Sequence, residues 1–499
     1  MKHLNIKIII SFLGLTSVMN GLFMLLSVPF SWYHKEEALM GILYAGLLTI
    51  ALGFSMWFFT RNAPKTLHKK EGYMIVTFGW LMLTLTGTLP YVFTGAIPSF
   101  IDAIFEAISG YSTTGASILT DIESLPKGIL FWRSSTHWIG GMGIIVLTIA
   151  ILPLLGIGGM QLFMAEAPGP STDKMHPRIT ETAKRLWAIY FLFTIIEFLL
   201  LKVAGMTWFD AINHAMATMS TGGFSTKNAS IAYWNGMPVV QYIVIFFMFI
   251  AGTNFLLSYF ALTAKFNKIV RNEEFKYYFL GVSAVIIMIT LVIVFFQDPN
   301  LVTSVNHPMP WGRVESSFRH AAFQVIAIVT TTGFVSADYT MWHGIVTMLI
   351  FSLFFVGGSA GSTAGGVKIV RHIIMMKNAI LEFKKILHPN AIIPVRYDKN
   401  RVPGKVVYNI LSFFVLYMSI FIGSAIILSF MGLDFETAIG AAASSLGNVG
   451  PAFGQLGPVA NYAWLPDSAK LFTSFLMLIG RLELFTVLVL FTPFFWRKN

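Results

Sequence analysis

Long apolar runs, separated by short polar or basic connections, dominate the pattern of this chain. A helix that crosses a bilayer needs about 20 mostly apolar residues, and ten stretches reach that length. They cover residues 5–29, 39–60, 72–95, 131–155, 183–204, 238–263, 275–296, 343–376, 406–430 and 469–493. The pattern therefore predicts an all-α polytopic membrane protein. No cleavage pattern of small residues follows the first stretch, which favours a retained helix over a removed signal peptide.

Four shorter segments between these stretches resemble one another. Each is an alanine-rich, weakly apolar run that ends in small polar residues and a glycine. The four read FIDAIFEAISGYSTTGAS from Phe100, FDAINHAMATMSTGGFS from Phe209, SFRHAAFQVIAIVTTTGFVS from Ser317 and FETAIGAAASSLGNVGPAF from Phe435. Aligning Gly115, Gly222, Gly333 and Gly450 gives a nearly constant spacing, which is typical of internal repeats. About twelve helical residues rise roughly 18 Å, half of the hydrocarbon thickness, so each segment can enter the membrane and return.

Each half-helix lies between two crossing helices, so the predicted unit is helix, half-helix with loop, helix. Two crossings per unit insert all four units in the same direction, and such parallel repeats are related by an axis along the membrane normal. We therefore expect a pseudo-fourfold, potassium-channel-like ring of helix–pore-loop–helix repeats plus an N-terminal two-helix hairpin. The predicted ranges are 1–62 for the hairpin and 71–157, 183–264, 275–385 and 405–496 for the four repeats.

The four glycine-bearing loops predict a cation filter. Irregular backbone at membrane depth is tolerated only where protein buries it or where it lines a watery cavity, and backbone carbonyls can replace the hydration shell of a cation. A single loop of this kind is equally consistent with an ordinary turn and with a filter. Four such loops in register favour a filter. The candidate residues are Thr113, Thr114 and Gly115; Ser220, Thr221 and Gly222; Thr331, Thr332 and Gly333; and Asn448, Val449 and Gly450. The fourth loop lacks the threonines of the others.

Acidic residues lie near the starts of three of the half-helices, at Asp102, Asp210 and Glu436. They either concentrate cations near the filter or cap the helix N-termini. Capping is the favoured interpretation.

Charge is scarce and unevenly placed. Charged residues make up 11% of the 499 residues, against roughly 25% in soluble proteins. The net charge of +11 does not indicate a nucleic-acid partner, because Lys and Arg gather in alternate connections, most densely from Lys368 to Lys405. The positive-inside rule then places both termini in the cytoplasm. This basic face could meet lipid headgroups or a cytosolic regulator.

A glycine-rich segment, GGSAGSTAGG, interrupts the eighth apolar stretch. Its glycines are Gly357, Gly358, Gly361, Gly365 and Gly366. Each costs a helix about 1 kcal/mol relative to alanine, so we expect the helix to break here. The segment is interpreted as an intramembrane gate loop below the filter, with close packing through small residues as the alternative. A phosphate-binding loop is excluded by its spacing.

Arg481 lies within the last apolar stretch, at the position aligned with Gly141, Gly252 and Gly358. A charge at this depth normally faces the protein interior and marks a functional site. Glu483 is a poor partner because it lies on another face of the helix. Arg481 is therefore expected near the pore, beside the glycine-rich segment, with a purely structural role as the alternative. Glu197 is expected to pair with Lys202.

Catalysis is not indicated. The sequence has no HExxH, GxSxG or DxDxDG motif and no cysteine. His214 and His320, both in half-helices, are interpreted as polar lining or as satisfied buried histidines. We expect a transporter that binds no catalytic cofactor and carries K+ as its transported ion.

The chain resembles a TrkH-type subunit of the Trk/Ktr/HKT superfamily of potassium transporters over nearly its whole length. The resemblance rests on the four loops and on GMQLFMAEAPGPSTDKMHPRITETAKRLW from Gly159, GGSAGSTAGGVK from Gly357, HPNA from His388 and IGRLELFTVLVLFTP from Ile479. It implies potassium uptake across a bacterial inner membrane, a gate at Gly357–Gly366, a homodimer and a TrkA-type cytosolic nucleotide-binding subunit. In some plant members a serine replaces the first filter glycine and accompanies sodium permeation, so glycine in all four loops favours potassium. A sodium-permeable protein or an ion-coupled (H+/Na+) symporter remains the alternative.

Overall fold

The computed structural model describes residues 4–62, 68–146, 175–297, 308–391 and 393–497. Over these ranges six helices are long and apolar enough to cross a membrane, and two bent pairs of helices meet the same criterion together. The fourth predicted stretch is described only as far as Val146. Most of the motif that starts at Gly159 lies outside the described residues. The prediction of an all-α protein with many membrane spans is confirmed.

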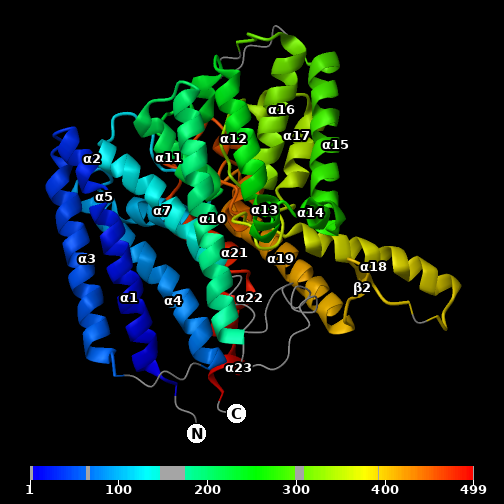
Figure 1. Cartoon of the computed structure of the whole chain (residues 1–499), viewed down its shortest axis with the longest axis horizontal. Helices are drawn as coiled ribbons and strands as arrows, with labels where there is room; N and C mark the ends of the chain where they lie inside the picture. Colours follow the sequence, from blue (N-terminus) through cyan, green and yellow to red (C-terminus); the bar gives the residue numbers. More distant parts are fainter. Residues whose placement is uncertain (1–3, 63–67, 147–174, 298–307, 392, 498–499) are drawn as a thin grey trace.

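An N-terminal pair of helices lies at one edge of the molecule (Figure 1). Its elements are α1 (Ile6–Leu25), α2 (Val28–Tyr33) and α3 (Ala38–Thr60). Gly14 and Gly53 let α1 and α3 approach closely, since a methyl group on Gly14 would lie 2.6 Å from the carbonyl oxygen of Gly53. Small residues commonly allow such contact between membrane helices. Asn20 of α1 accepts a 2.7 Å hydrogen bond from the Tyr111 hydroxyl, which ties the pair to the first half-helix.

Four units follow, each with a first helix, a half-helix and a second helix. Unit 1 contains α4 (Lys69–Gly87), α5 (Leu89–Phe93), α6 (Phe100–Tyr111) and α7 (Lys127–Val146). Unit 2 contains α10 (Met175–Val203), α11 (Trp208–Met219), η3 (Ser230–Trp234), α12 (Pro238–Ala251), α13 (Phe255–Leu262) and α14 (Phe266–Arg271). The half-helices α6 and α11 have 12 residues each, which matches the length expected for a segment that enters and returns.

Units 3 and 4 repeat this order. Unit 3 contains α15 (Glu273–Phe296), α16 (Arg313–Val329), η4 (Tyr339–Met341), α17 (Gly344–Leu353) and α18 (Ile369–Leu387). A short hairpin of β1 (Arg396–Tyr397) and β2 (Asn400–Arg401) joins it to unit 4. Unit 4 contains α19 (Gly404–Phe430), α20 (Phe435–Gly447), η5 (Gly454–Leu456), α21 (Asp467–Arg481), α22 (Phe485–Leu488), η6 (Val489–Phe491) and α23 (Pro493–Trp496).

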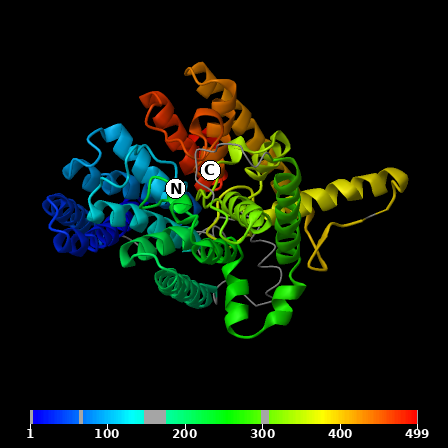
Figure 2. The ribbon, with the colours of Figure 1, turned by 90° about the horizontal axis from the view of Figure 1, so that it is seen from above.

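The units are arranged around a common centre in chain order (Figure 2). At three of the four junctions the second helix of one unit packs against the half-helix of the next: α7 against α11, α12 against α16, and α21 of unit 4 against α6 of unit 1. The last of these contacts closes the ring. The exact ends of the predicted ranges stay a prediction, and residues 147–157 of the first range lie outside the described part of the chain.

The second helix is broken in units 2, 3 and 4, whereas the sequence predicts a break only in unit 3. The α12–α13 pair bends by 110° and the α21–α22 pair by 107°. In unit 2 the Asn254 side chain accepts from the Leu256 N–H at 2.9 Å and starts a new helix. In unit 4 Glu483 and Leu484 have φ of 61° and 51°, which ends the helix without glycine. The breaks in units 2 and 4 come directly after the aligned residues Gly252 and Arg481.

Candidate ion filter

Each half-helix ends in the same turn. The N–H groups of Thr114, Gly222, Thr332 and Val449 donate to the carbonyl five residues earlier at 2.9, 2.8, 2.8 and 3.0 Å. The residue before each of them is left-handed, with φ of 52° at Thr113, 56° at Thr221, 54° at Thr331 and 56° at Asn448. This is the Schellman arrangement that satisfies the last carbonyls of a helix. The four loops therefore leave their helices with one shared geometry.

Three of these left-handed residues are threonines, which is unusual. A β-branched residue at positive φ is a genuine outlier, and such strain costs about 1–3 kcal/mol per residue. Asparagine adopts the left-handed conformation more readily, so Asn448 is the relaxed member of the set. The fourth loop differs from the others in sequence, but it keeps their backbone. Strain that recurs in three loops is typical of a functional site.

A second positive-φ position makes the four loops contact one another. Gly115, Gly223, Gly333 and Gly450 have φ of 82°, 85°, 72° and 102°. Methyl groups on these four glycines would lie 2.2, 2.0, 2.0 and 2.5 Å from the carbonyl oxygens of Gly222, Thr332, Val449 and Thr114, respectively. Each glycine thus packs on a carbonyl of the next loop, and the fourth loop returns to the first. The four loops form a closed ring.

The register of the second loop differs from the predicted one. The sequence alignment places Gly222 with Gly115, but the structural equivalent of Gly115 is Gly223. Gly222 corresponds to Thr114, the residue whose carbonyl faces the neighbouring loop. The two adjacent glycines of this loop leave the sequence alignment ambiguous by one residue, and only the backbone angles resolve it. All the candidate filter residues remain in or next to the ring, and their role as ion ligands stays a prediction.

After its glycine, each loop runs back along its own half-helix, and this part is called the returning segment. In the first three units, polar side chains of the half-helices hold the returning segment in place. His214 contacts the Asp210 carbonyl at 2.7 Å and the Ser225 hydroxyl at 2.9 Å, so its interpretation as a satisfied buried histidine is confirmed. His320 contacts the Ser336 hydroxyl at 3.0 Å. In the same unit, Gln324 donates to the Ala337 carbonyl at 3.2 Å. These bonds fix the loops to the helices behind them.

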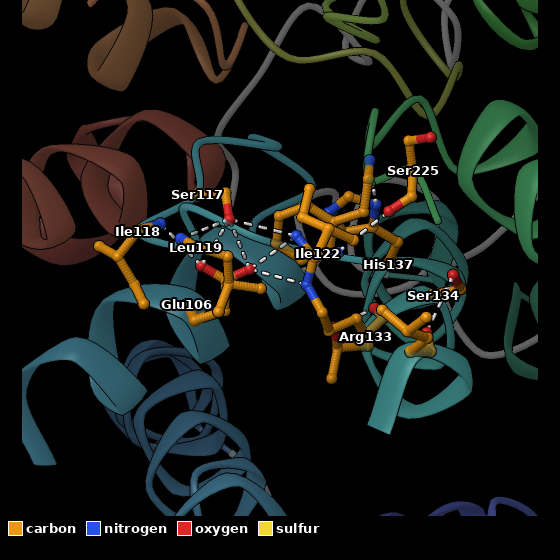
Figure 3. Close-up of polar contacts among 12 residues, drawn as sticks. Glu106, Ser117, Ile118, Leu119, Ile122, Arg133, Ser134, His137 and Ser225 are labelled. Carbon is orange, nitrogen blue, oxygen red and sulfur yellow. Dashed lines mark hydrogen bonds and ion pairs between the residues drawn. The ribbon is translucent and has the colours of Figure 1, made fainter. Parts of the chain in front are cut away.

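In unit 1 this support is a buried ion pair that the sequence analysis missed (Figure 3). The Arg133 guanidinium lies 2.7 Å from the Glu106 carboxylate, and the two side chains are 1% and 0% exposed. Glu106 also accepts from the Ser117 hydroxyl at 3.0 Å, and Arg133 donates to the Ser225 carbonyl at 3.1 Å. This one ion pair therefore links the returning segments of loops 1 and 2. The signal in the sequence was Arg133 itself, a charged residue inside the apolar stretch 131–155.

The half-helix N-termini are capped by residues other than the predicted ones. Ser99, Thr207 and Asp434 accept from backbone N–H groups as N-caps. The predicted capping acids Asp102, Asp210 and Glu436 lie inside the first turn, where they favour the helix dipole. Asp102 also forms an ion pair with Lys470 at 2.6 Å. The capping prediction named the wrong side chains because the N-cap is the residue just before the first helical residue, and the three acids lie two or three residues after it.

The glycine-rich segment breaks the helix as predicted and lies against the C-terminal ends of three half-helices. The Gly365 N–H donates to the Thr331 hydroxyl at 2.6 Å. The Thr363 hydroxyl donates to the Met219 carbonyl at 3.0 Å. A methyl group on Gly365 would lie 2.7 Å from the Gly447 carbonyl oxygen. The segment therefore contacts the ends of the half-helices of units 2, 3 and 4 next to the ring.

Arg481 completes this layer from unit 4. Its guanidinium is buried and donates to the Thr363 carbonyl at 2.8 Å and to the Gly140 carbonyl of unit 1 at 3.5 Å. One side chain thus joins three units through the glycine-rich segment. Glu483 pairs instead with Arg371, in line with the expectation that it is a poor partner for Arg481. The gating role of the segment and of Arg481 stays a prediction.

The predicted pair of Glu197 and Lys202 is wrong. Lys202 turns away, donates to the Met206 carbonyl at 3.3 Å and lies 5.3 Å from the centre of the Trp208 ring. Glu197 is fully buried within α10. The spacing of five residues along the helix puts the two side chains on different faces.

Removing the Thr331 hydroxyl is expected to loosen the glycine-rich segment. Thr331→Val keeps the shape but leaves the buried Gly365 N–H without its acceptor, at a cost of about 1–3 kcal/mol. In this cysteine-free chain, thiol labelling of Ala360→Cys measures the opening of the segment. We expect faster labelling with Thr331→Val. Thr221→Val is the matched control, since among the described residues its hydroxyl donates to the Ser220 carbonyl and not to the glycine-rich segment. Equal labelling rates in the two variants would show that this bond does not hold the segment.

Comparison with known proteins agrees with this architecture. The family model described as TrkH, cation transport protein, matches residues 38–498. The Trk system potassium uptake protein TrkH of Halomonas elongata is 38% identical over 99% of this chain and 100% of its own length. TrkH of Escherichia coli is 39% identical over 90% of this chain and 91% of its own. The crystal structure of the potassium transporter TrkH from Vibrio parahaemolyticus superimposes with a TM-score of 0.88 at 33% identity, covering 99% of this chain and 100% of the other. The chain therefore belongs to the TrkH family of cation transport proteins.

Proposed function

We propose that this chain takes up potassium across the inner membrane of a bacterium by passing the dehydrated ion through the ring of four loops. The observation that carries the proposal is the closed contact of each loop glycine with a carbonyl of the next loop. Oxygen ligands held in such a ring suit a hard monovalent cation. Within the described ranges, no group of three or more His, Cys, Asp or Glu side chains is placed to hold a metal ion.

The gate in this proposal is the segment Gly357–Gly366, held by Arg481. It lies at the C-terminal ends of the half-helices, whose dipoles favour a cation there, and it is bonded to Thr331 of the ring. Two partners complete the proposal: a second copy of this chain, and a TrkA-type cytosolic nucleotide-binding subunit. Both come from the family resemblance. The relatives are named as parts of a Trk system, which is in keeping with a regulatory partner.

Expression in a bacterium that lacks its own potassium uptake systems tests this function. We expect growth at low external potassium to be restored, together with uptake of labelled potassium or rubidium. Gly333→Asp, which puts a charged side chain against the Val449 carbonyl of the ring, is the matched control and should not restore growth. Absence of uptake by the unaltered chain, with membrane insertion verified, would refute the proposal.

A further inference from the structure

A pocket of about 1120 Å³ lies on the face that the basic residues assign to the cytoplasm. Its walls come from α13, α14, the start of α15, α18 and the β1–β2 hairpin, next to the point where α18 leaves the body of the protein (Figure 1). The basic residues that line it are Lys268, Arg271, Lys276, Lys377, Arg396 and Lys399. Two acids, Glu273 and Asp398, also line it. The pocket therefore carries a clear excess of positive charge.

Both acids are engaged in holding the hairpin. Glu273 accepts from the Asp398 N–H at 2.9 Å, and Asp398 accepts from the Glu273 N–H at 2.8 Å. Glu273 also pairs with Lys377. Arg271, Lys276 and Lys399 are exposed, and none of the three forms an ion pair within the described residues. These three side chains are available to an anion.

One wall of the pocket is apolar and continues into the membrane. Tyr277 and Leu280 of α15 line the pocket. The same face of the helix continues through Ile287 and Leu291, and Leu280, Ile287 and Leu291 are 64%, 56% and 50% exposed. A free phosphate uses only the basic side of such a site. A lipid uses both sides, with its phosphate among the basic side chains and its acyl chains along α15.

We propose that this pocket binds the headgroup of an anionic phospholipid from the inner leaflet. Basic pockets between membrane helices on the cytoplasmic side suit anionic headgroups, and each Lys or Arg near the surface contributes about 1 kcal/mol. The acyl chains lie against the exposed apolar face of α15. The site is separate from the ring of loops and binds the lipid whether or not an ion is present.

The pocket shares a wall with the glycine-rich segment. Asn254 lines the pocket, and the N–H of the next residue, Phe255, donates to the Gly361 carbonyl at 3.1 Å. Glu274 accepts from the Ala360 N–H at 2.8 Å and follows Glu273 of the pocket. A bound lipid therefore fixes the segment more firmly. An effect on ion flux would rest on the proposed function, but the effect on the segment itself does not.

Lipid binding is tested directly with the purified full-length chain. Native mass spectrometry measures retention of phosphatidylglycerol and of phosphatidylcholine with the same acyl chains. We expect selective retention of phosphatidylglycerol, weakened roughly 100-fold by Arg271→Gln, Lys276→Gln and Lys399→Gln together. The matched control, Lys184→Gln, Lys384→Gln and Lys405→Gln, removes the same charge from exposed positions outside the pocket and should retain the lipid. Equal retention by the two triple variants would overturn the site, and so would displacement of the lipid by equimolar inorganic phosphate.

Labelling of Ala360→Cys tests the link to the segment. In vesicles with phosphatidylglycerol the thiol is expected to react several-fold more slowly than in pure phosphatidylcholine, and the pocket triple variant should abolish the difference. A lipid effect that persists in the pocket variant would contradict the link. Neither experiment measures transport, so a chain that fails to move potassium can still pass both tests, and a chain that fails both can still transport.

Discussion

Serine in place of Gly115 or Gly223 is expected to lower the preference for potassium over sodium by at least about tenfold. Either Cβ would lie about 2 Å from a carbonyl oxygen of the next loop, and either residue would then be strained at positive φ, at a cost of about 1–3 kcal/mol. A ring that shifts to relieve this strain no longer fits one ion, and a change of about 1.4 kcal/mol in the relative binding of the two ions corresponds to a factor of ten. The measurement is the ratio of potassium to sodium permeability in proteoliposomes.

Gly236→Ser is the matched control for these variants. Gly236 is exposed, lies in a connection of the same unit as Gly223, and a Cβ there would contact nothing within 4 Å. Its permeability ratio should equal that of the unaltered chain. Because Gly115 and Gly223 occupy equivalent positions in the ring, their serine variants should also agree with each other. An unchanged ratio in both would remove the ring from the selectivity mechanism.

The sequence predicts the architecture well because its signals are long or repeated. Apolar stretches of membrane length and four related half-helices determine the number and direction of the units. The ring of Figure 2 follows from them. The break at Gly357–Gly366 is predicted because several glycines act together. The break after Arg481 is missed because it depends on Glu483 and Leu484 at positive φ, residues with no intrinsic preference for that conformation.

The candidate site is predicted at the level of loops but not of single atoms. The second loop is an example: the alignment chose Gly222, whereas Gly223 occupies the ring position. A sequence alignment does not contain the backbone angles that distinguish two adjacent glycines. The support behind the loops is missed for another reason. Glu106 and Arg133 lie on different helices and meet only when α6 and α7 pack. The residues equivalent to Glu106 in units 2 and 3 are His214 and Gln324, neither of which is acidic. A search for repeated residues therefore passes over it.

Breaking that buried pair is expected to produce the largest loss of stability. Glu106→Gln leaves the Arg133 charge buried without its partner, which typically costs about 3–5 kcal/mol. It also weakens the bonds to Ser117 and Ser225 behind loops 1 and 2. We expect a clear drop in the thermal unfolding midpoint of the purified chain, together with a lowered potassium-to-sodium ratio in the protein that remains folded.

Glu382→Gln supplies the control, because it removes one partner of the exposed Lys385–Glu382 pair, whose side chains are 40% and 54% exposed. Such surface pairs contribute about 0–1 kcal/mol, so its midpoint should barely move. Replacing both members of the buried pair, Glu106→Leu with Arg133→Met, removes the unpaired charge and should recover much of the lost midpoint. It should not recover selectivity, because the hydrogen bonds to the returning segments of loops 1 and 2 are gone. A double variant that regains stability and selectivity alike would mean that the pair only fills space, whereas recovery of stability alone assigns it to the alignment of loops 1 and 2.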